Sequence, residues 1–89
     1  MTYAATDQKN VYIERYGTPG KTIYLTVLND SAEAVYVTIA VDTTALGLLD
    51  QEVTELIGDS SPVIEKSPGK WRWKAELNGE EARLYRIGL

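Results

Sequence analysis

Hydrophobic and polar residues alternate along most of this chain, and the alternation is clearest over residues 34–42. There, Val35, Val37, Ile39 and Val41 occupy every second position. Successive side chains of a β-strand point to opposite faces, so this spacing places all four on one face. All four are β-branched, and such a row predicts a strand with one face packed on a hydrophobic core.

The same period of two recurs in short segments separated by turn residues. It predicts further strands at residues 11–16, 21–29, 52–57, 63–65, 71–77 and 81–87. Six or seven short strands with frequent turns are typical of a small antiparallel β-sandwich, of the Greek-key or immunoglobulin-like kind. Residues 1–10 lack an apolar period and are expected to form a lead-in or linker. We therefore expect one all-β domain at residues 11–89.

Two connections are predicted to close hairpins. The polar segment NDSAEA joins the strands at 21–29 and 34–42. Asn78-Gly79 is favoured in a two-residue type I′ turn, because both positions need positive φ. A strict two-residue turn there would place Trp73 opposite Leu84 and Trp71 opposite Arg86. The strand at 71–77 is then expected beside the strand at 81–87.

Residues 43–58 fit two interpretations. Leu46, Leu49, Val53 and Leu56 follow a helical spacing, and Gly58 would end such a helix. The alternative is a short helical turn near residues 43–49, followed by a strand. The second interpretation is favoured because the neighbouring segments are all predicted strands.

Composition limits the chemistry open to this fold. The chain has 89 residues, no cysteine and no histidine. Disulfides, thiolate metal sites and Ser-His-Asp or Cys-His arrangements are therefore excluded. A net charge of −4 does not favour nucleic acid, whose phosphates attract basic surfaces. The carboxylates lie at turns or alternate with core positions, so we expect a solvated face with no catalytic residue, metal or cofactor.

The first ten residues, MTYAATDQKN, contain neither a basic segment nor an apolar one. We therefore expect no signal peptide in this sequence. No apolar run approaches the roughly 20 residues of a membrane-spanning helix, so we expect a soluble protein without a membrane partner. The compartment stays open, because the sequence suits the cytoplasm and also a domain of a secreted protein.

Tryptophans provide the first candidate binding positions. Trp71 and Trp73 share one face of their strand with Ala75 and Leu77, which predicts core packing. The alternative is a platform on which both indole rings stack against a carbohydrate. A third option is an interface with another domain, where tryptophan is enriched.

A second candidate group consists of Tyr24, Leu28 and Tyr36, which point away from the predicted core. One interpretation is cross-strand stabilisation between neighbouring tyrosines. The other is a docking face for a partner domain, since large apolar groups gathered on an outer face often mark an interaction surface.

Three stretches together resemble a known family. They are VYIERYG at residues 11–17, KTIYLTVLNDSAEAVYVTIAVD at residues 21–42 and WKAELNGEEARLYRIGL at residues 73–89. This combination resembles the small β-sandwich domain on the C-terminal side of the catalytic barrel in many bacterial glycoside hydrolases with an α-amylase-like architecture. Residues 43–66 depart from the pattern.

The resemblance implies a non-catalytic domain that stabilises or orients the catalytic barrel of the same polypeptide. The catalytic carboxylates of such enzymes come from the barrel, so the resemblance assigns none to this chain. Two other functions remain open. One is a carbohydrate-binding module that uses Trp71 and Trp73, and the other is an immunoglobulin-like spacer domain of a surface protein.

Overall fold

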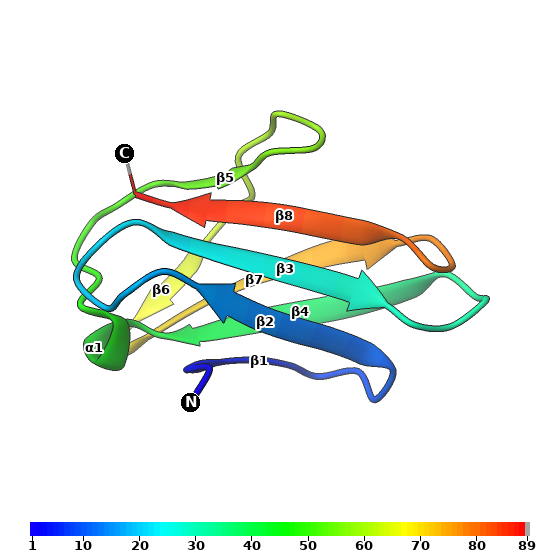
Figure 1. Ribbon diagram of the computed structural model, residues 1–89, viewed down its shortest axis with the longest axis horizontal. Coiled ribbons are helices and arrows are strands. Elements are labelled where there is room, and N and C mark those ends of the chain that lie inside the picture. Colours follow the sequence, from blue (N-terminus) through cyan, green and yellow to red (C-terminus); the bar gives the residue numbers. More distant parts are fainter. Residues whose placement is uncertain (89) are drawn as a thin grey trace.

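Eight β-strands and one short helix make up the computed structural model, which describes residues 1–88. The strands form two antiparallel four-stranded sheets that face each other, sheet A in the order β1-β4-β7-β6 and sheet B in the order β2-β3-β8-β5 (Figure 1). The strands are β1 Ala4–Thr6, β2 Val11–Tyr16, β3 Ile23–Asn29, β4 Val35–Asp42, β5 Val53–Glu55, β6 Glu65–Ser67, β7 Lys70–Leu77 and β8 Ala82–Ile87. The predicted small antiparallel β-sandwich is confirmed.

β1 lies in the segment predicted to be a lead-in. Its residues pair with β4, with Ala5 opposite Ala40. The lead-in prediction is therefore wrong for residues 4–6, because three residues are too few to show a period. Leu89, the last residue of the predicted domain, lies outside the described residues.

The helical turn predicted near residues 43–49 is present as α1, Thr43–Leu46. Asp42 Oδ1 accepts a hydrogen bond of 2.9 Å from the Ala45 N–H and so caps the first turn. Gly47 ends the turn with a left-handed φ of 68°. The alternative of a helix reaching Gly58 is wrong, because β5 occupies part of that segment. No helix within residues 1–88 is long and apolar enough to cross a bilayer.

The core lies between the sheets and is formed by the inward faces of the long strands. Trp73 of β7 meets Tyr85 of β8 edge to face, with ring centroids 5.2 Å apart, and so joins the two sheets. Of the β-branched row on β4, Val35 is partly buried and the other three are buried. Buried hydrophobic residues are Val11, Ile23, Leu25, Val27, Val37, Ile39, Val41, Leu46, Leu48, Val53, Trp71, Trp73, Leu77, Tyr85 and Ile87.

Both predicted hairpins are wrong. β3 and β4 belong to different sheets, and so do β7 and β8. β7 pairs with β4 instead, which places Trp73 opposite Ile39 and Trp71 opposite Val41. β3 pairs with β8. The connections at residues 30–34 and 78–81 therefore cross from one sheet to the other.

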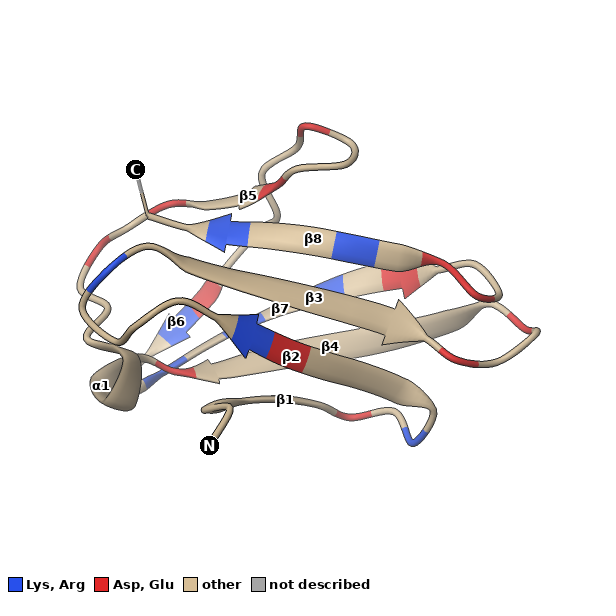
Figure 2. Cartoon of the chain, viewed as in Figure 1, with Lys and Arg blue, Asp and Glu red and all other residues tan. Residues whose placement is uncertain are grey.

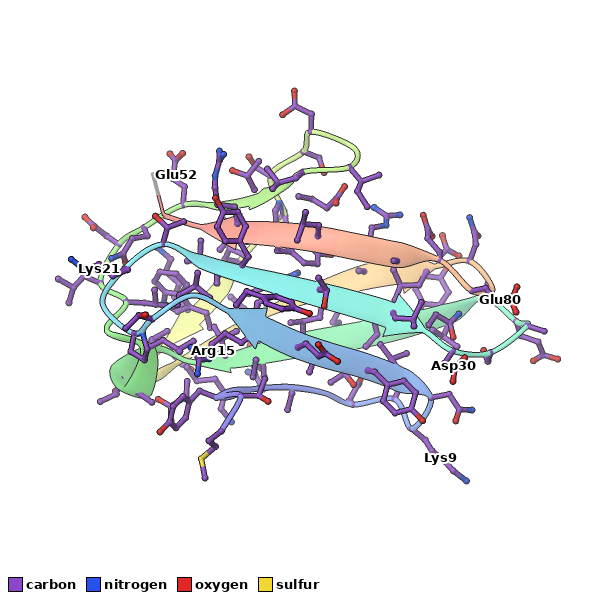
Figure 3. All side chains as sticks on the ribbon, in the orientation of Figure 1. Lys9, Arg15, Lys21, Asp30, Glu52 and Glu80 are labelled. Atoms are coloured by element: carbon purple, nitrogen blue, oxygen red, sulfur yellow. The ribbon has the colours of Figure 1, made fainter. Side chains whose placement is uncertain are left out.

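Close backbone approach explains the crossing at Asn78-Gly79. Positive φ falls on Glu80 (60°) and not on the two residues that a type I′ turn requires. A Cβ on Gly79 would lie only 2.2 Å from the Ala32 carbonyl oxygen, so this position needs glycine for space. The Glu80 N–H donates to Ser31 O at 2.9 Å. The two crossings therefore pack against each other, and Asp30 and Glu80 lie at the same end of the sandwich (Figure 3).

The buried side chain of Asn29 links these two crossings. Its Nδ2 donates to Glu33 O (2.8 Å), Asn78 O (2.9 Å) and Leu77 O (3.4 Å). Its Oδ1 accepts from the Ser31 hydroxyl at 2.8 Å. Asn29 is completely buried, so its own amide depends on these protein partners for its hydrogen bonds. One amide therefore satisfies carbonyls from both connections between the sheets.

Replacing Asn29 by Asp tests this link. The carboxylate has no N–H to donate and turns negative charge toward three carbonyl oxygens, so we expect the free energy of unfolding to fall by about 3 kcal/mol or more. Urea unfolding at neutral pH measures the free energy of unfolding of the variant and of the unchanged protein. The same change at the exposed Asn10 is the control and should cost about 0.5 kcal/mol or less. Similar losses in both variants would contradict the proposed link.

Candidate functional site

The outer face of sheet B gathers large side chains that face solvent. The alternation within β2 and β3 turns Tyr12, Tyr16, Tyr24 and Leu28 outward, with exposed fractions of 55%, 52%, 38% and 41%. Leu84 of β8 adds a partly buried side chain. We call these five residues the tyrosine face.

Strand register makes the tyrosine face continuous. Tyr16 lies opposite Tyr24, and Tyr12 lies opposite Leu28. Leu84 lies opposite Thr26, the β3 residue between these pairs. Side chains opposed in this way have Cβ atoms about 5 Å apart. Four residues of strand span about 13 Å and three strands span about 10 Å, so the residues form one nearly flat surface.

Few charges interrupt this surface. Glu14 lies between Tyr12 and Tyr16 on β2, and its Oε2 accepts a hydrogen bond of 2.8 Å from the Tyr16 hydroxyl. This hydrogen bond, with the charge of the carboxylate, raises the pKa of Tyr16 above its ordinary value. Arg86 lies opposite Tyr24 on β8. Figure 2 shows that β3, in the middle of the face, carries no charged residue.

The outer face of sheet A is of a different kind. β7 turns Lys70, Arg72, Lys74 and Glu76 to solvent. The Arg72 guanidinium pairs with the Glu65 carboxylate of β6. The two outer faces of the sandwich therefore differ: β7 of sheet A presents three cationic side chains and one carboxylate, whereas sheet B presents mainly tyrosine and leucine.

The predicted docking group is divided between these two faces. Tyr24 and Leu28 lie together on sheet B, but Tyr36 lies on the outer face of sheet A, where it is 75% exposed. The prediction grouped all three because it treated β3 and β4 as a hairpin. Tyr12 and Tyr16 were missed, although the alternation of VYIERY already placed them on the face opposite Val11.

Both indoles lie in the core, as the strand pattern predicted. Trp71 is 4% exposed and Trp73 is 2% exposed. The Lys66 Nζ lies 4.5 Å from the Trp71 ring centroid. The predicted hairpin had placed Arg86, and not Lys66, beside this ring. Stacking on a sugar requires an accessible ring face, and neither indole offers one in this structure.

Several carboxylates hold the backbone. Asp7 Oδ1 accepts from the Thr38 N–H at 2.8 Å, and Glu81 Oε1 accepts from the Asn78 N–H at 2.8 Å. Asp42 does the same at the start of α1, so all three carboxylates accept hydrogen bonds from backbone N–H groups. Within residues 1–88, no group of three or more potential ligand side chains is placed to hold a metal ion.

Glu55 is a buried carboxylate at the end of β5. It accepts hydrogen bonds from the backbone N–H groups of Ile57, Gly58 and Leu84, and Arg83 Nη1 lies 3.8 Å from Oε1. Burial, the largest single influence, raises the pKa of Glu55, but the three N–H donors and the Arg83 charge outweigh it. The pKa therefore lies below its ordinary value of 4.5. The side chain fastens the loop after β5 to β8.

No protein-family model, curated protein or solved structure matches this chain. The resemblance to accessory domains of glycoside hydrolases therefore stays a prediction from the three sequence stretches. The fold class rests on the structure itself, and the candidate site rests on the arrangement of residues in sheet B.

Glu55→Gln tests the buried carboxylate. Because the folded-state pKa is below 4.5, the ionised side chain stabilises the fold above that pH, and this contribution is lost as the pH falls through the folded pKa. We expect the variant to be less stable at pH 7 by about 1–3 kcal/mol, with the difference shrinking below pH 4.5. Urea unfolding at several pH values measures both. Glu52→Gln, at an exposed site, is the control, and a pH-independent difference for Glu55→Gln would contradict the assignment.

Proposed function

We propose that the chain is a non-catalytic β-sandwich module that docks onto a second protein domain through the tyrosine face. The contrast between the two outer faces carries this proposal. Protein interfaces are enriched in tyrosine and arginine and depleted in lysine relative to the remaining surface. Sheet B follows that composition, whereas sheet A carries the lysines and acids of a solvated surface.

The size of the face supports a contact between domains. With its side chains the tyrosine face covers on the order of 400 Å². A stable complex of independent proteins needs about 800 Å² on each side. Interfaces between domains of one chain bury about 600–1,500 Å² in total. A tethered second domain therefore fits this surface better than a freely diffusing partner.

The sequence resemblance suggests the identity of that domain. It points to the catalytic barrel of a glycoside hydrolase, which this module would stabilise or orient. The structural use of Asp42 and Glu55 is consistent with a packing role, because these carboxylates are bound to backbone N–H groups.

Photochemical cross-linking tests the docking face. We place p-benzoylphenylalanine at Tyr16 and express the gene product in its own cell. Illumination should join residue 16 to the second domain, because that side chain would lie within the interface. The same amino acid at Tyr36 is the matched control. It is more exposed but lies on sheet A, so it should give no cross-link to the second domain.

Mass spectrometry of the cross-linked peptide separates the two parts of the proposal. A peptide from a glycoside hydrolase barrel would support both the docking face and the enzyme assignment. A peptide from another fold would support the face and reject the enzyme. Equal yields of the cross-link to the second domain from positions 16 and 36, or no such cross-link from position 16, would reject the face.

Carbohydrate binding on the same face is a second candidate, because three tyrosine rings lie on one flat strand surface. Titration with maltohexaose, cellohexaose and xylohexaose distinguishes it, with NMR detection of the rings of Tyr12, Tyr16 and Tyr24. The docking proposal predicts no saturable shift. A saturable shift that disappears in Tyr16→Ala and persists in Tyr36→Ala would support carbohydrate binding on this face and contradict the docking proposal.

A further inference from the structure

β7 has an open edge in sheet A. It pairs with β4 along its whole length but with β6 only through Lys70, Trp71 and Arg72. Residues 73–77 therefore have β4 on one side and, within residues 1–88, no strand on the other. An open edge presents N–H and C=O groups that can pair with another strand.

The direction of these groups follows from the β4 ladder. In an antiparallel sheet, the backbone N–H and C=O groups of successive residues in a strand point alternately to the two neighbouring strands. On β4, Thr38 O accepts from Asp7 N at 3.2 Å, and Asp42 N donates to Tyr3 O at 2.9 Å. Even-numbered residues of β4 therefore bond toward β1, and odd-numbered residues bond toward β7.

The same alternation applies to β7. Trp73 and Ala75 lie opposite odd-numbered residues of β4, so their backbone groups bond to that strand. Lys74 and Glu76 therefore direct their N–H and C=O groups to the open edge. Arg83 Nη2 makes a long hydrogen bond of 3.4 Å to Glu76 O, which agrees with this direction.

The open edge is accessible. A hollow of about 810 Å³ adjoins it, bordered by Lys74 and Arg72 of β7 and by residues 63–65. Lys74 and Glu76 are exposed, and no ion pair among the described residues includes either of them. The Lys74 ammonium is therefore available to an incoming strand, and the Glu76 carboxylate, which interacts with the Tyr36 hydroxyl opposite it on β4, is still exposed to one.

We propose that two copies of the chain pair through this edge, β7 against β7, antiparallel about Ala75. A two-fold axis at Ala75 places Lys74 opposite Glu76 of the second copy, and Glu76 opposite Lys74. The backbones of each opposed Lys74 and Glu76 then form two N–H···O hydrogen bonds with each other, as in the hydrogen-bonded pairs of an antiparallel sheet. Opposite charges facing each other across strands are favourable, and the two-fold axis makes the contact self-complementary.

Charge complementarity selects a second copy as the occupant. Residues 74–76 read Lys-Ala-Glu. When a second copy runs antiparallel to the first, each Lys faces a Glu, so the charges of the strand are complementary to those of its own copy. Residues 2–6 lie along the edge of β2, where Thr6 Oγ1 donates to Val11 O and Arg15 Nε donates to Thr2 O. On the open side of residues 73–77 of β7, the hydrogen bond from Arg83 to Glu76 O is long, at 3.4 Å. The tyrosine face lies on the other sheet, so the pairing does not depend on the proposed function.

Charge exchange tests the register. The contact is short, so we expect a reversible dimer with a dissociation constant on the order of 100 µM. Lys74→Glu places Glu opposite Glu, and Glu76→Lys places Lys opposite Lys. Each should weaken the dimer about tenfold or more. The double variant K74E/E76K restores opposite charges and should restore dimerisation. Sedimentation equilibrium up to about 1 mM covers this range.

Two controls isolate the contact. Lys9→Glu makes the same charge change as Lys74→Glu at an exposed position outside β7 and should leave the dimer unchanged. Tyr16→Ala should also leave it unchanged, which separates this contact from pairing through the tyrosine face. Circular dichroism confirms that each variant is folded. A monomer at every concentration, single variants without effect, or a double variant that stays monomeric would each overturn the proposal.

Discussion

The hydrogen bonds of the Asn29 amide are the constraint on which the architecture depends. They join the two connections that cross between the sheets, and the Asn29 side chain that makes them is completely buried. A buried amide and its carbonyl partners are costly to leave unpaired, so these hydrogen bonds stabilise both crossings. The crossings send β3 and β4 to different sheets, and they do the same for β7 and β8.

This division of strands gives the protein two unlike outer surfaces. Sheet B places Tyr12, Tyr16 and Tyr24 on one flat face, whereas sheet A alternates lysine, arginine and glutamate along β7. The proposed domain contact uses the first surface, and the proposed pairing of copies uses an edge of the second sheet. The two contacts involve different strands, so one molecule can make both.

Much of the fold follows from local alternation. The row of β-branched residues on β4, the inward Trp71 and Trp73, and the outward Tyr24 and Leu28 were all readable from the period of two. The polar turn at Asn78-Gly79 was recognised, but its geometry was not. Gly79 is needed because Ala32 lies against it, and nothing near Gly79 in the sequence signals that neighbour.

The sequence by itself determined which side chains share a face of each strand, because alternation is a local property of an extended chain. Only the tertiary structure decided which strands are neighbours, because that choice depends on contacts between distant residues such as Asn29 and Asn78. Tyr24 and Tyr36 therefore lie on opposite sides of the molecule although both point outward. Tyr12 and Tyr16 join Tyr24 because β2 pairs with β3.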